Sequence, residues 1–199
     1  TLKILQKRGK FMQEAVPSGE GAMLVVLGMA SKELDKILEM NNKKYECFIA
    51  NDNSNLQVVV SGLKKDINLL SDDLSNKKIK NLRLNVSAPF HCKYMKTASE
   101  KMTSFINDLN INELEKPIIS NVTANEISSP KEIKSLLISQ IEKKVRWLES
   151  VEYMINNGVK NFVEIGPGKV LSGLIKRINK NVNVRSINSV EDIKLLIND

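Results

Sequence analysis

Ala22-Met23-Leu24-Val25-Val26-Leu27-Gly28 decides the fold of the first half of this chain. The run is apolar, has the length of a buried strand, and ends at a glycine. Leu34, Ile37 and Leu38 follow at the spacing of one helix face. Residues 45–50 then predict a second strand, so the chain opens this region as strand, helix, strand.

The pattern continues with the same alternation of elements. The polar run 51–55 predicts a turn, residues 56–60 a third strand, and residues 64–74 a second helix. Residues 79–86 alternate apolar and polar side chains and predict a fourth strand with one wet face. The resulting order, β-α-β-β-α-β, is ferredoxin-like, and it predicts a small subdomain over residues 19–87.

The second half of the chain has a different pattern. A long amphipathic helix is predicted just after residue 91, with one face formed by Met95, Ala98, Met102, Phe105, Ile106 and Leu109. Strands are predicted at residues 117–122, 161–165 and 183–187, with helices between them. Strands that alternate with helices are typical of a parallel α/β layer. We therefore predict an α/β fold in which residues 1–18 and 88–199 form a larger subdomain.

Composition limits the class of protein. The chain has 199 residues, of which 42% are hydrophobic, and carries a net charge of +7. No apolar run is long enough to cross a membrane, and no signal peptide is evident. Cys47 and Cys92 are too few and too far apart for a disulfide scaffold or a zinc site, so a cytoplasmic protein is expected. The chain does not begin with methionine, so we expect it to be a piece of a longer protein.

The positive charge has two interpretations. Solvated lysine faces explain it, and so does an acidic partner, either a nucleic acid or a negatively charged protein. Three Tyr, five Phe and one Trp supply few platforms for stacking bases. A nucleic-acid partner is therefore not expected.

His91 is the single histidine of the chain and the one candidate for a proton shuttle near neutral pH. A lone histidine is also compatible with a structural role. Gly166-Pro167-Gly168-Lys169 invites comparison with a phosphate-binding loop, but Val170 replaces the Ser or Thr that such a loop needs. We predict a tight strand-to-helix turn there, and no metal site.

Five strings in order carry a family resemblance. They are Arg8 to Pro17, Ser87 to Cys92 with Met95, Ile119 to Thr123, Val145 to Trp147, and Glu164 to Leu171. At this spacing the chain, from Arg8 to about Ile178, resembles the C-terminal two-thirds of bacterial malonyl-CoA:acyl carrier protein transacylases. The resemblance implies a ferredoxin-like subdomain inserted into a larger α/β-hydrolase-like acyltransferase body, with the site in the cleft between the two.

The resemblance also implies a reaction. A serine on a G-x-S-x-G elbow would take the malonyl group from coenzyme A and pass it to the phosphopantetheine thiol of acyl carrier protein, in fatty acid synthesis. No serine here has a glycine two residues away on both sides. By the resemblance, the elbow would lie before Thr1, and these 199 residues alone would be a poor catalyst.

Six residues match positions of the family's site. His91 would be the general base, oriented by a side-chain or backbone carbonyl of Gln140. Arg8 would hold the malonyl carboxylate with its guanidinium fork. Three further residues would contact the acyl group or line its pocket: Met12, Phe90 and Asn53. Taken without the resemblance, Arg8 also fits a surface arginine, Met12 a core side chain, Gln140 a helix end, and Asn53 a turn.

Other functions stay open at this point. The chain also fits the acyltransferase domain of a polyketide synthase, and a truncated, non-catalytic module that binds acyl carrier protein or coenzyme A. An RNA-binding ferredoxin-like domain is disfavoured, because the strands at 22–27 and 56–60 lack a pair of aromatic residues. The resemblance implies a monomer, malonyl-CoA and acyl carrier protein as partners, and no bound cofactor.

Overall fold

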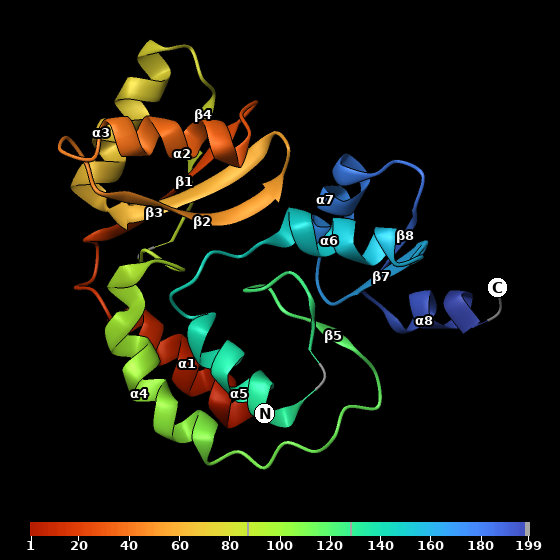
Figure 1. The fold of residues 1–199 in the computed structure, drawn as a ribbon. Coiled ribbons are helices and arrows are strands. Elements are labelled where there is room, and N and C mark those ends of the chain that lie inside the picture. Colours follow the sequence, from red (N-terminus) through yellow and green to blue (C-terminus); the bar gives the residue numbers. More distant parts are fainter. Residues whose placement is uncertain (87, 128, 198–199) are drawn as a thin grey trace. The chain divides into compact units, whose positions relative to one another are not determined.

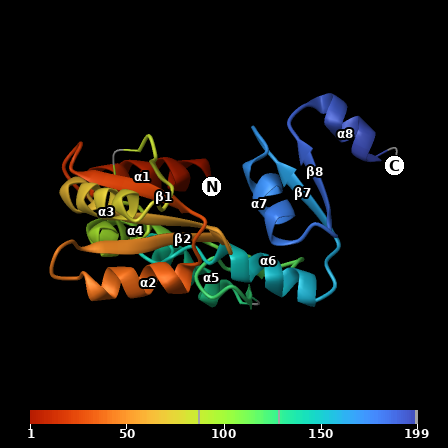
Figure 2. The same cartoon turned by 90° about the horizontal axis from the view of Figure 1, so that it is seen from above.

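The computed structural model describes residues 1–86, 88–127 and 129–197. The chain divides into two compact units, Thr1–Trp147 and Leu148–Asp199, and each is an assembly of helices and strands (Figures 1 and 2). Ser87, which belongs to the string around His91, lies outside the described residues. None of the described helices is long and apolar enough to span a bilayer.

The first unit contains a four-stranded antiparallel sheet. Its elements are β1 (Gly21–Leu27), α2 (Ser31–Met40), β2 (Cys47–Ser54), β3 (Gln57–Leu63), α3 (Lys64–Asn76) and β4 (Asn81–Arg83). The strand order is β2-β3-β1-β4, and neighbouring strands are antiparallel. The chain order predicted from the sequence, βαββαβ, is present.

Alternation along the strands separates two faces of this sheet. Leu24 and Val26 of β1 point to the face that α2 and α3 cover, where they pack with Leu34 of α2 and Leu70 of α3. These four side chains are fully buried. Because strand side chains alternate between faces, Met23 lies on the opposite face, in a smaller cluster to which Phe90 contributes.

A second cluster lies among three helices of the same unit. These are α1 (Leu2–Glu14), α4 (Lys96–Asn107) and α5 (Pro130–Ser139), with the short 3₁₀ turn η1 (Lys93–Met95) leading into α4. Figure 1 shows the three helices side by side. Met12, Met95, Met102 and Ile141 are buried between them, with Phe90 packed at the edge. Phe90 therefore touches both the helical cluster and the sheet.

Two predicted boundaries need correction. The helix predicted to include Leu109 ends at Asn107. Asn53 was predicted in a turn, but it belongs to β2, and the turn falls at residues 55–56. The strand extends because Asp52 and Ser54 are buried in alternation and pair with β3 across two irregularities of register. Tertiary pairing thus outweighs the turn preference of Asn and Asp.

The outer elements of the first unit are short. The strand predicted at 117–122 is reduced to β5 (Ile118–Ile119), which pairs with β6 (Glu126–Ile127). Residues 121–123 form the turn between them. The fourth sheet strand is also shorter than predicted, and its Leu82 is 66% exposed, so this apolar face is not covered within the first unit.

The second unit follows the predicted alternation. It contains α6 (Trp147–Asn156), β7 (Asn161–Ile165), α7 (Val170–Ile178), β8 (Asn183–Ile187) and α8 (Val190–Ile197), with α6 beginning at the border residue. The strands β7 and β8 are parallel. Gly166 and Gly168 adopt φ angles of 136° and 95° in the turn after β7, a region of backbone space in which glycine carries no steric penalty.

Candidate active site

The loop after β4 holds His91 in an unusual backbone conformation. The φ angle of His91 is 59°, a left-handed conformation that costs a residue with a side chain about 1–2 kcal/mol. Hydrogen bonds on both sides hold the loop: Phe90 N donates to Ala88 O at 3.1 Å, and Cys92 Sγ donates to Pro89 O at 3.1 Å. The loop therefore aims the imidazole in a fixed direction.

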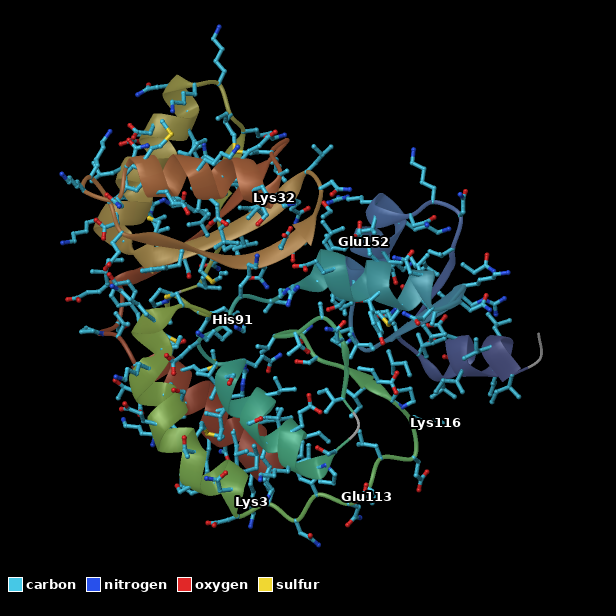
Figure 3. All side chains as sticks on the ribbon, in the orientation of Figure 1. Lys3, Lys32, His91, Glu113, Lys116 and Glu152 are labelled. Atoms are coloured by element: carbon cyan, nitrogen blue, oxygen red, sulfur yellow. The ribbon has the colours of Figure 1, made fainter. Side chains whose placement is uncertain are left out.

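That direction is toward the end of α5. Figure 3 shows His91 between the sheet and the helices α4 and α5. The imidazole Nδ1 lies 2.9 Å from the backbone oxygen of Gln140. A carbonyl oxygen only accepts hydrogen bonds, so Nδ1 carries the proton and Nε2 is left with a lone pair. This is the tautomer that a general base needs.

The environment of His91 holds the imidazole neutral near pH 7. Burial lowers its pKa below the ordinary value, the hydrogen bond to the Gln140 carbonyl raises it, and the charge of Arg8 lowers it, with a net decrease. A proton arriving on Nε2 gives an imidazolium at the C-terminus of α5. The negative end of the helix dipole and the carbonyl both stabilise that cation.

Arg8 lies on α1 and is half-buried. Burial lowers the pKa of its guanidinium, which nevertheless stays protonated at any physiological pH. Its charge acts on His91, so the two groups lie within electrostatic reach of each other. Within the described part of the chain, no hydrogen bond or ion pair engages this guanidinium, which leaves its donors available to an anionic group.

The remaining three predicted site residues are placed differently. Met12 is 4% exposed and packs in the helical cluster with Met95 and Met102. Phe90 is half-buried beside His91. Asn53 is half-buried in β2. His91 is connected to Gln140 by a hydrogen bond, to Arg8 by its charge and to Phe90 as its neighbour in the chain. Among the six predicted site residues, His91 alone lines the pocket described next.

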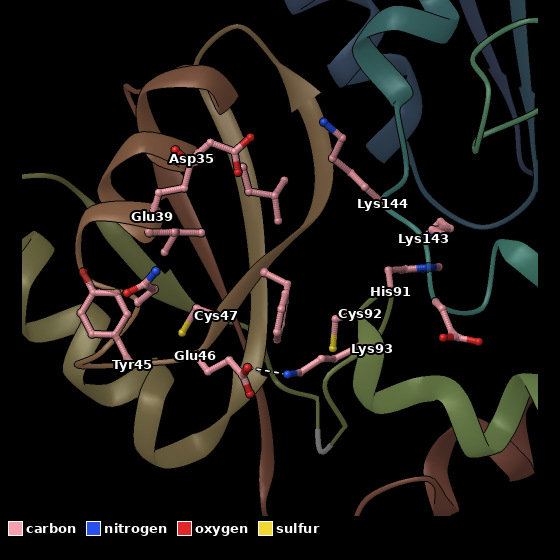
Figure 4. Close-up of a pocket in the computed structure, with 15 residues that line it drawn as sticks. Asp35, Glu39, Tyr45, Glu46, Cys47, His91, Cys92, Lys93, Lys143 and Lys144 are labelled. Carbon is pink, nitrogen blue, oxygen red and sulfur yellow. Dashed lines mark hydrogen bonds and ion pairs between the residues drawn. The ribbon is translucent and has the colours of Figure 1, made fainter.

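An open pocket of about 510 Å³ includes His91 on its wall. Figure 4 shows His91, Cys92 and Lys93 on one side and Glu46 and Cys47 on the other, with Lys93 paired to Glu46. The volume lies in the range of small-molecule sites. Both thiols are buried, and burial raises the pKa of Cys47 to about 12, so neither is poised as a nucleophile.

Comparison with known proteins places this geometry in a family. Residues 1–194 match the acyl transferase domain family. This chain belongs to that family. It is 41% identical over 198 residues to the malonyl CoA-acyl carrier protein transacylase of Bacillus subtilis, and 41% identical over 199 residues to that of a Staphylococcus aureus strain. These matches cover 97% of the chain but 62% and 63% of the two relatives.

Solved structures agree with the sequence relatives. The malonyl CoA-acyl carrier protein transacylase of Clostridium perfringens matches with a TM-score of 0.93 and 38% identity, over 99% of this chain and 62% of that one. A malonyl-transacylase in complex with a type II polyketide synthase acyl carrier protein matches with a TM-score of 0.93 and 34% identity, over 100% of this chain and 65% of that one. The acyltransferase chain described here thus spans about three-fifths of the length of these relatives.

In this acyltransferase chain, the carboxylate of Glu164 binds the helix N-terminus that follows the glycine turn. Glu164, at the end of β7, accepts hydrogen bonds from Leu171 N at 3.0 Å and Ser172 N at 2.7 Å. These amides open α7, the place where a phosphate would bind. Hydrogen bonds from Ser172 and Leu171 lower the pKa of Glu164. The prediction of a strand-to-helix turn is confirmed, and its helix N-terminus is already capped.

Sequence reasoning missed two residues of the candidate site, Asn121 and Arg146. Gln140 Nε2 donates to Asn121 Oδ1 at 2.9 Å, and Arg146 Nη1 donates to Thr123 O at 2.9 Å. Both residues lie in strings that carried the resemblance, but neither string received a chemical role. No spacing rule connects positions 121, 140 and 146, because their contacts arise only when the chain folds back on itself.

Proposed function

We propose that the protein carrying this chain transfers the malonyl group from malonyl-CoA to the phosphopantetheine thiol of acyl carrier protein, in fatty acid synthesis. The observation that carries the proposal is the 2.9 Å contact from His91 Nδ1 to the Gln140 carbonyl, beside a half-buried arginine. The names of the relatives support it. Malonyl-CoA and acyl carrier protein are thus the proposed partners, since one relative is seen in complex with a carrier protein.

His91 would move the proton in both half-reactions. In the first, a serine hydroxyl attacks the thioester carbonyl, its proton passes to His91 Nε2, and the same proton goes to the departing coenzyme A sulfur. In the second, the carrier thiol gives its proton to Nε2 and attacks the serine ester, and the serine oxygen takes the proton back. No serine of these 199 residues has the flanking glycines of the elbow, so the proposal places the nucleophile outside them.

The acyl group would be selected by charge and size. Arg8 would hold the malonyl carboxylate in a bidentate, charge-assisted contact. Phe90, beside the base, would exclude bulkier acyl groups, and Met12 would pack against the acyl chain. Discrimination by apolar contacts alone is worth about 1–3 kcal/mol, so the arginine would dominate selection. Asn53, on β2, is proposed to line the acyl pocket of the whole protein, apart from the open pocket that includes His91.

The finer architecture is also proposed. We infer a ferredoxin-like subdomain, residues 19–87, inserted into a larger hydrolase-like acyltransferase body to which residues 1–18 and 88–199 contribute. The strand order β2-β3-β1-β4 supports the first part, and the parallel pair β7–β8 supports the second. We further propose a monomer that works in the cytoplasm without a bound cofactor, since the phosphopantetheine arrives on the carrier protein.

Competing acyl donors test the proposal. In the protein carrying this chain, Arg8→Ala removes the charged contact, which is worth about 1.5–3 kcal/mol, so kcat/KM for malonyl-CoA should fall roughly 10- to 100-fold. Transfer from acetyl-CoA should change little, because acetyl has no carboxylate to lose. Arg8→Lys serves as the matched control, since it keeps the charge without the fork. Equal loss with both donors would refute the role of Arg8.

The transfer assay, with calorimetry beside it, also distinguishes a second candidate function, binding without transfer. A module that only binds would bind carrier protein or coenzyme A in calorimetry and give no malonyl-carrier product with any donor. That outcome would replace transfer by binding as the function of these residues.

A further inference from the structure

We propose that Asn121 and Arg146 are positioning residues that hold the Gln140 backbone carbonyl against His91. The proposal rests on the base role of His91 in the proposed function. Neither residue touches the imidazole in the contacts described. Both act through a chain of hydrogen bonds that begins at the edge of the four-stranded sheet and ends at Nδ1.

The Gln140 side chain does not serve the imidazole. Its amide donates to Asn121 Oδ1 at 2.9 Å, while its backbone oxygen accepts from His91 Nδ1 at 2.9 Å. Gln140 follows the last residue of α5, where carbonyls have no amide partner from a next turn and helix ends fray. Backbone hydrogen bonds from Gln140 N to Leu136 O at 2.8 Å and from Ile141 N to Ile138 O at 3.2 Å hold the main chain here. The side-chain bond to Asn121 is the anchor that ties this helix end to the neighbouring turn.

Asn121 is itself held in a built turn. Ser120 is 6% exposed, and its Oγ accepts from Val122 N at 3.1 Å and Thr123 N at 3.4 Å. Ala124 N closes the turn on Ser120 O at 2.8 Å. Such a turn fixes the backbone on which the Asn121 amide stands.

Arg146 locks this turn from the other side. Its backbone N donates to Asn121 O at 2.9 Å, and its Nη1 donates to Thr123 O at 2.9 Å and Val122 O at 3.3 Å. A guanidinium offers several donors in one plane, which suits adjacent carbonyls that point the same way. Arg146 thus stabilises the turn through both its side chain and its backbone.

The position of Arg146 is set by the sheet. Val145 N donates to Ala50 O at 2.8 Å, and Asp52 N donates to Val145 O at 2.9 Å, so residue 145 joins the edge of β2 as a parallel bridge. Sheet pairing fixes the register of residue 146. The path from β2 through Arg146, Asn121 and Gln140 to His91 lies within the first unit.

Loss of the anchor has a specific signature at His91. With a mobile carbonyl, the Nδ1–H tautomer loses its partner, so part of the neutral imidazole carries its proton on Nε2 and cannot act as base. The carbonyl also favours the charged ring, so its loss lowers the pKa of His91 further. Groups that orient a metal-binding histidine are worth roughly 10- to 100-fold in affinity or activity, and we take the same range for groups that orient a base. We expect kcat to fall by that factor in Asn121→Ala, with KM little changed.

The experiment reads His91 directly by NMR, in the protein carrying this chain. The imidazole ¹⁵N signals are assigned by their loss in His91→Ala, and they report tautomer and pKa without substrate. The variants are Asn121→Ala, Asn121→Asp, Gln140→Ala and the double alanine variant. Asn125→Ala is the matched control, because this exposed asparagine lies in the same hairpin and contributes its backbone oxygen to Ser120 N.

Asn121→Ala and Gln140→Ala should each shift the tautomer of His91 and lower its pKa. The double variant should do no more than either alone, since both substitutions remove the same Gln140–Asn121 hydrogen bond. Asn121→Asp keeps an acceptor oxygen and restores the Nδ1–H tautomer. The alanine variants of Asn121 and Gln140 leave the charged groups near the imidazole unchanged: Arg8 on α1, and Lys93, Glu142, Lys143 and Lys144 in the pocket that includes His91. Asn121→Asp adds one carboxylate, so its readout is the tautomer and not the pKa.

The outcomes separate this proposal from the proposed function. If the Asn121→Ala variant transfers malonyl more slowly but the tautomer and pKa of His91 and the acid limb of its pH–rate profile are unchanged, Asn121 is merely structural and the positioning role is wrong. If the signals shift as expected while no variant and no wild-type protein transfers malonyl, positioning stands and the proposed function fails. Arg146→Ala should move the same signals; an unmoved His91 in that variant removes Arg146 from the path.

Discussion

Gly21→Ala should disturb the His91 loop from a strand that never touches the imidazole. Gly21 begins β1. A methyl group at Gly21 would stand 2.2 Å from Pro89 Cδ, 2.7 Å from Pro89 N and 2.9 Å from Ala88 Cα. Gly21 has no positive φ angle, so the conflict is steric and not one of backbone conformation.

The size of the effect follows from these distances. Carbon atoms come into contact at about 3.5 Å, so the pair with Pro89 Cδ is short by about 1.3 Å. Two of the three neighbours are backbone atoms and cannot rotate away, so the loop or the strand must shift. Overpacking of this kind costs about 1–3 kcal/mol. A misplacement of about 1 Å at a catalytic group costs roughly 10²-fold in rate.

Thermal unfolding and malonyl transfer measure the two effects in the protein carrying this chain. In a domain of this size, each kcal/mol lowers Tm by about 2–4 °C. Gly173→Ala is the matched control, since Gly173 lies inside α7 with nothing within 4 Å of the added methyl, and it should gain about 0.5–1 kcal/mol. A Gly21→Ala protein with wild-type Tm and wild-type rate would refute the close approach of β1 to the loop.

Three further predictions rest on burial. The pKa of His91 is lowered, so the acid limb of the pH profile of kcat/KM should lie below pH 6.5, and an acid limb above 6.5 would contradict the burial argument. Because the folded pKa is below the unfolded one, the stability contributed by His91 is complete above about pH 6.5 and is lost as pH falls toward the folded value. Cys47 and Cys92 are buried, so a thiol reagent at pH 7.5 should label neither before unfolding, and rapid labelling of the native protein would show that the pocket wall opens. Leu24→Ala, at a fully buried position, should destabilise by about 2–5 kcal/mol in denaturant unfolding, whereas a loss below 1 kcal/mol would mean that the sheet and its helices are loosely packed.

Sequence patterns predicted the small sheet because its central strands are short, continuous apolar runs bounded by turn residues. Leu24 and Val26 of β1 are buried against the helices and Met23 on the opposite face, and a run of this kind is visible locally in the sequence. The boundary at Asn53 could not be predicted, because a polar run favours a turn until pairing with β3 is known. Leu82 shows the converse case, an apolar alternation whose strand is short and whose face is not covered within its unit.

The candidate site could be predicted where a residue stands in a string that carries the family resemblance. His91 and Arg8 are such residues, and the structure brings them within electrostatic reach of each other, while their roles stay predictions. The choice between side chain and backbone at Gln140 could not be made from sequence, since it depends on Asn121, 19 positions away. Long-range hydrogen bonds of this kind leave no periodic signal, so the positioning network emerged only from the fold.

The central claim is that His91 is the base of an acyl transfer reaction. The most direct measurement is the rate at which the protein carrying this chain converts malonyl-CoA and acyl carrier protein into malonyl-carrier protein, compared with its His91→Ala variant at equal folded fraction. General base catalysis contributes about 10²–10⁴-fold, so the variant should lose at least a factor of ~100. Transfer by the variant at the wild-type rate, or a folded wild-type protein that makes no malonyl-carrier product, would contradict the account.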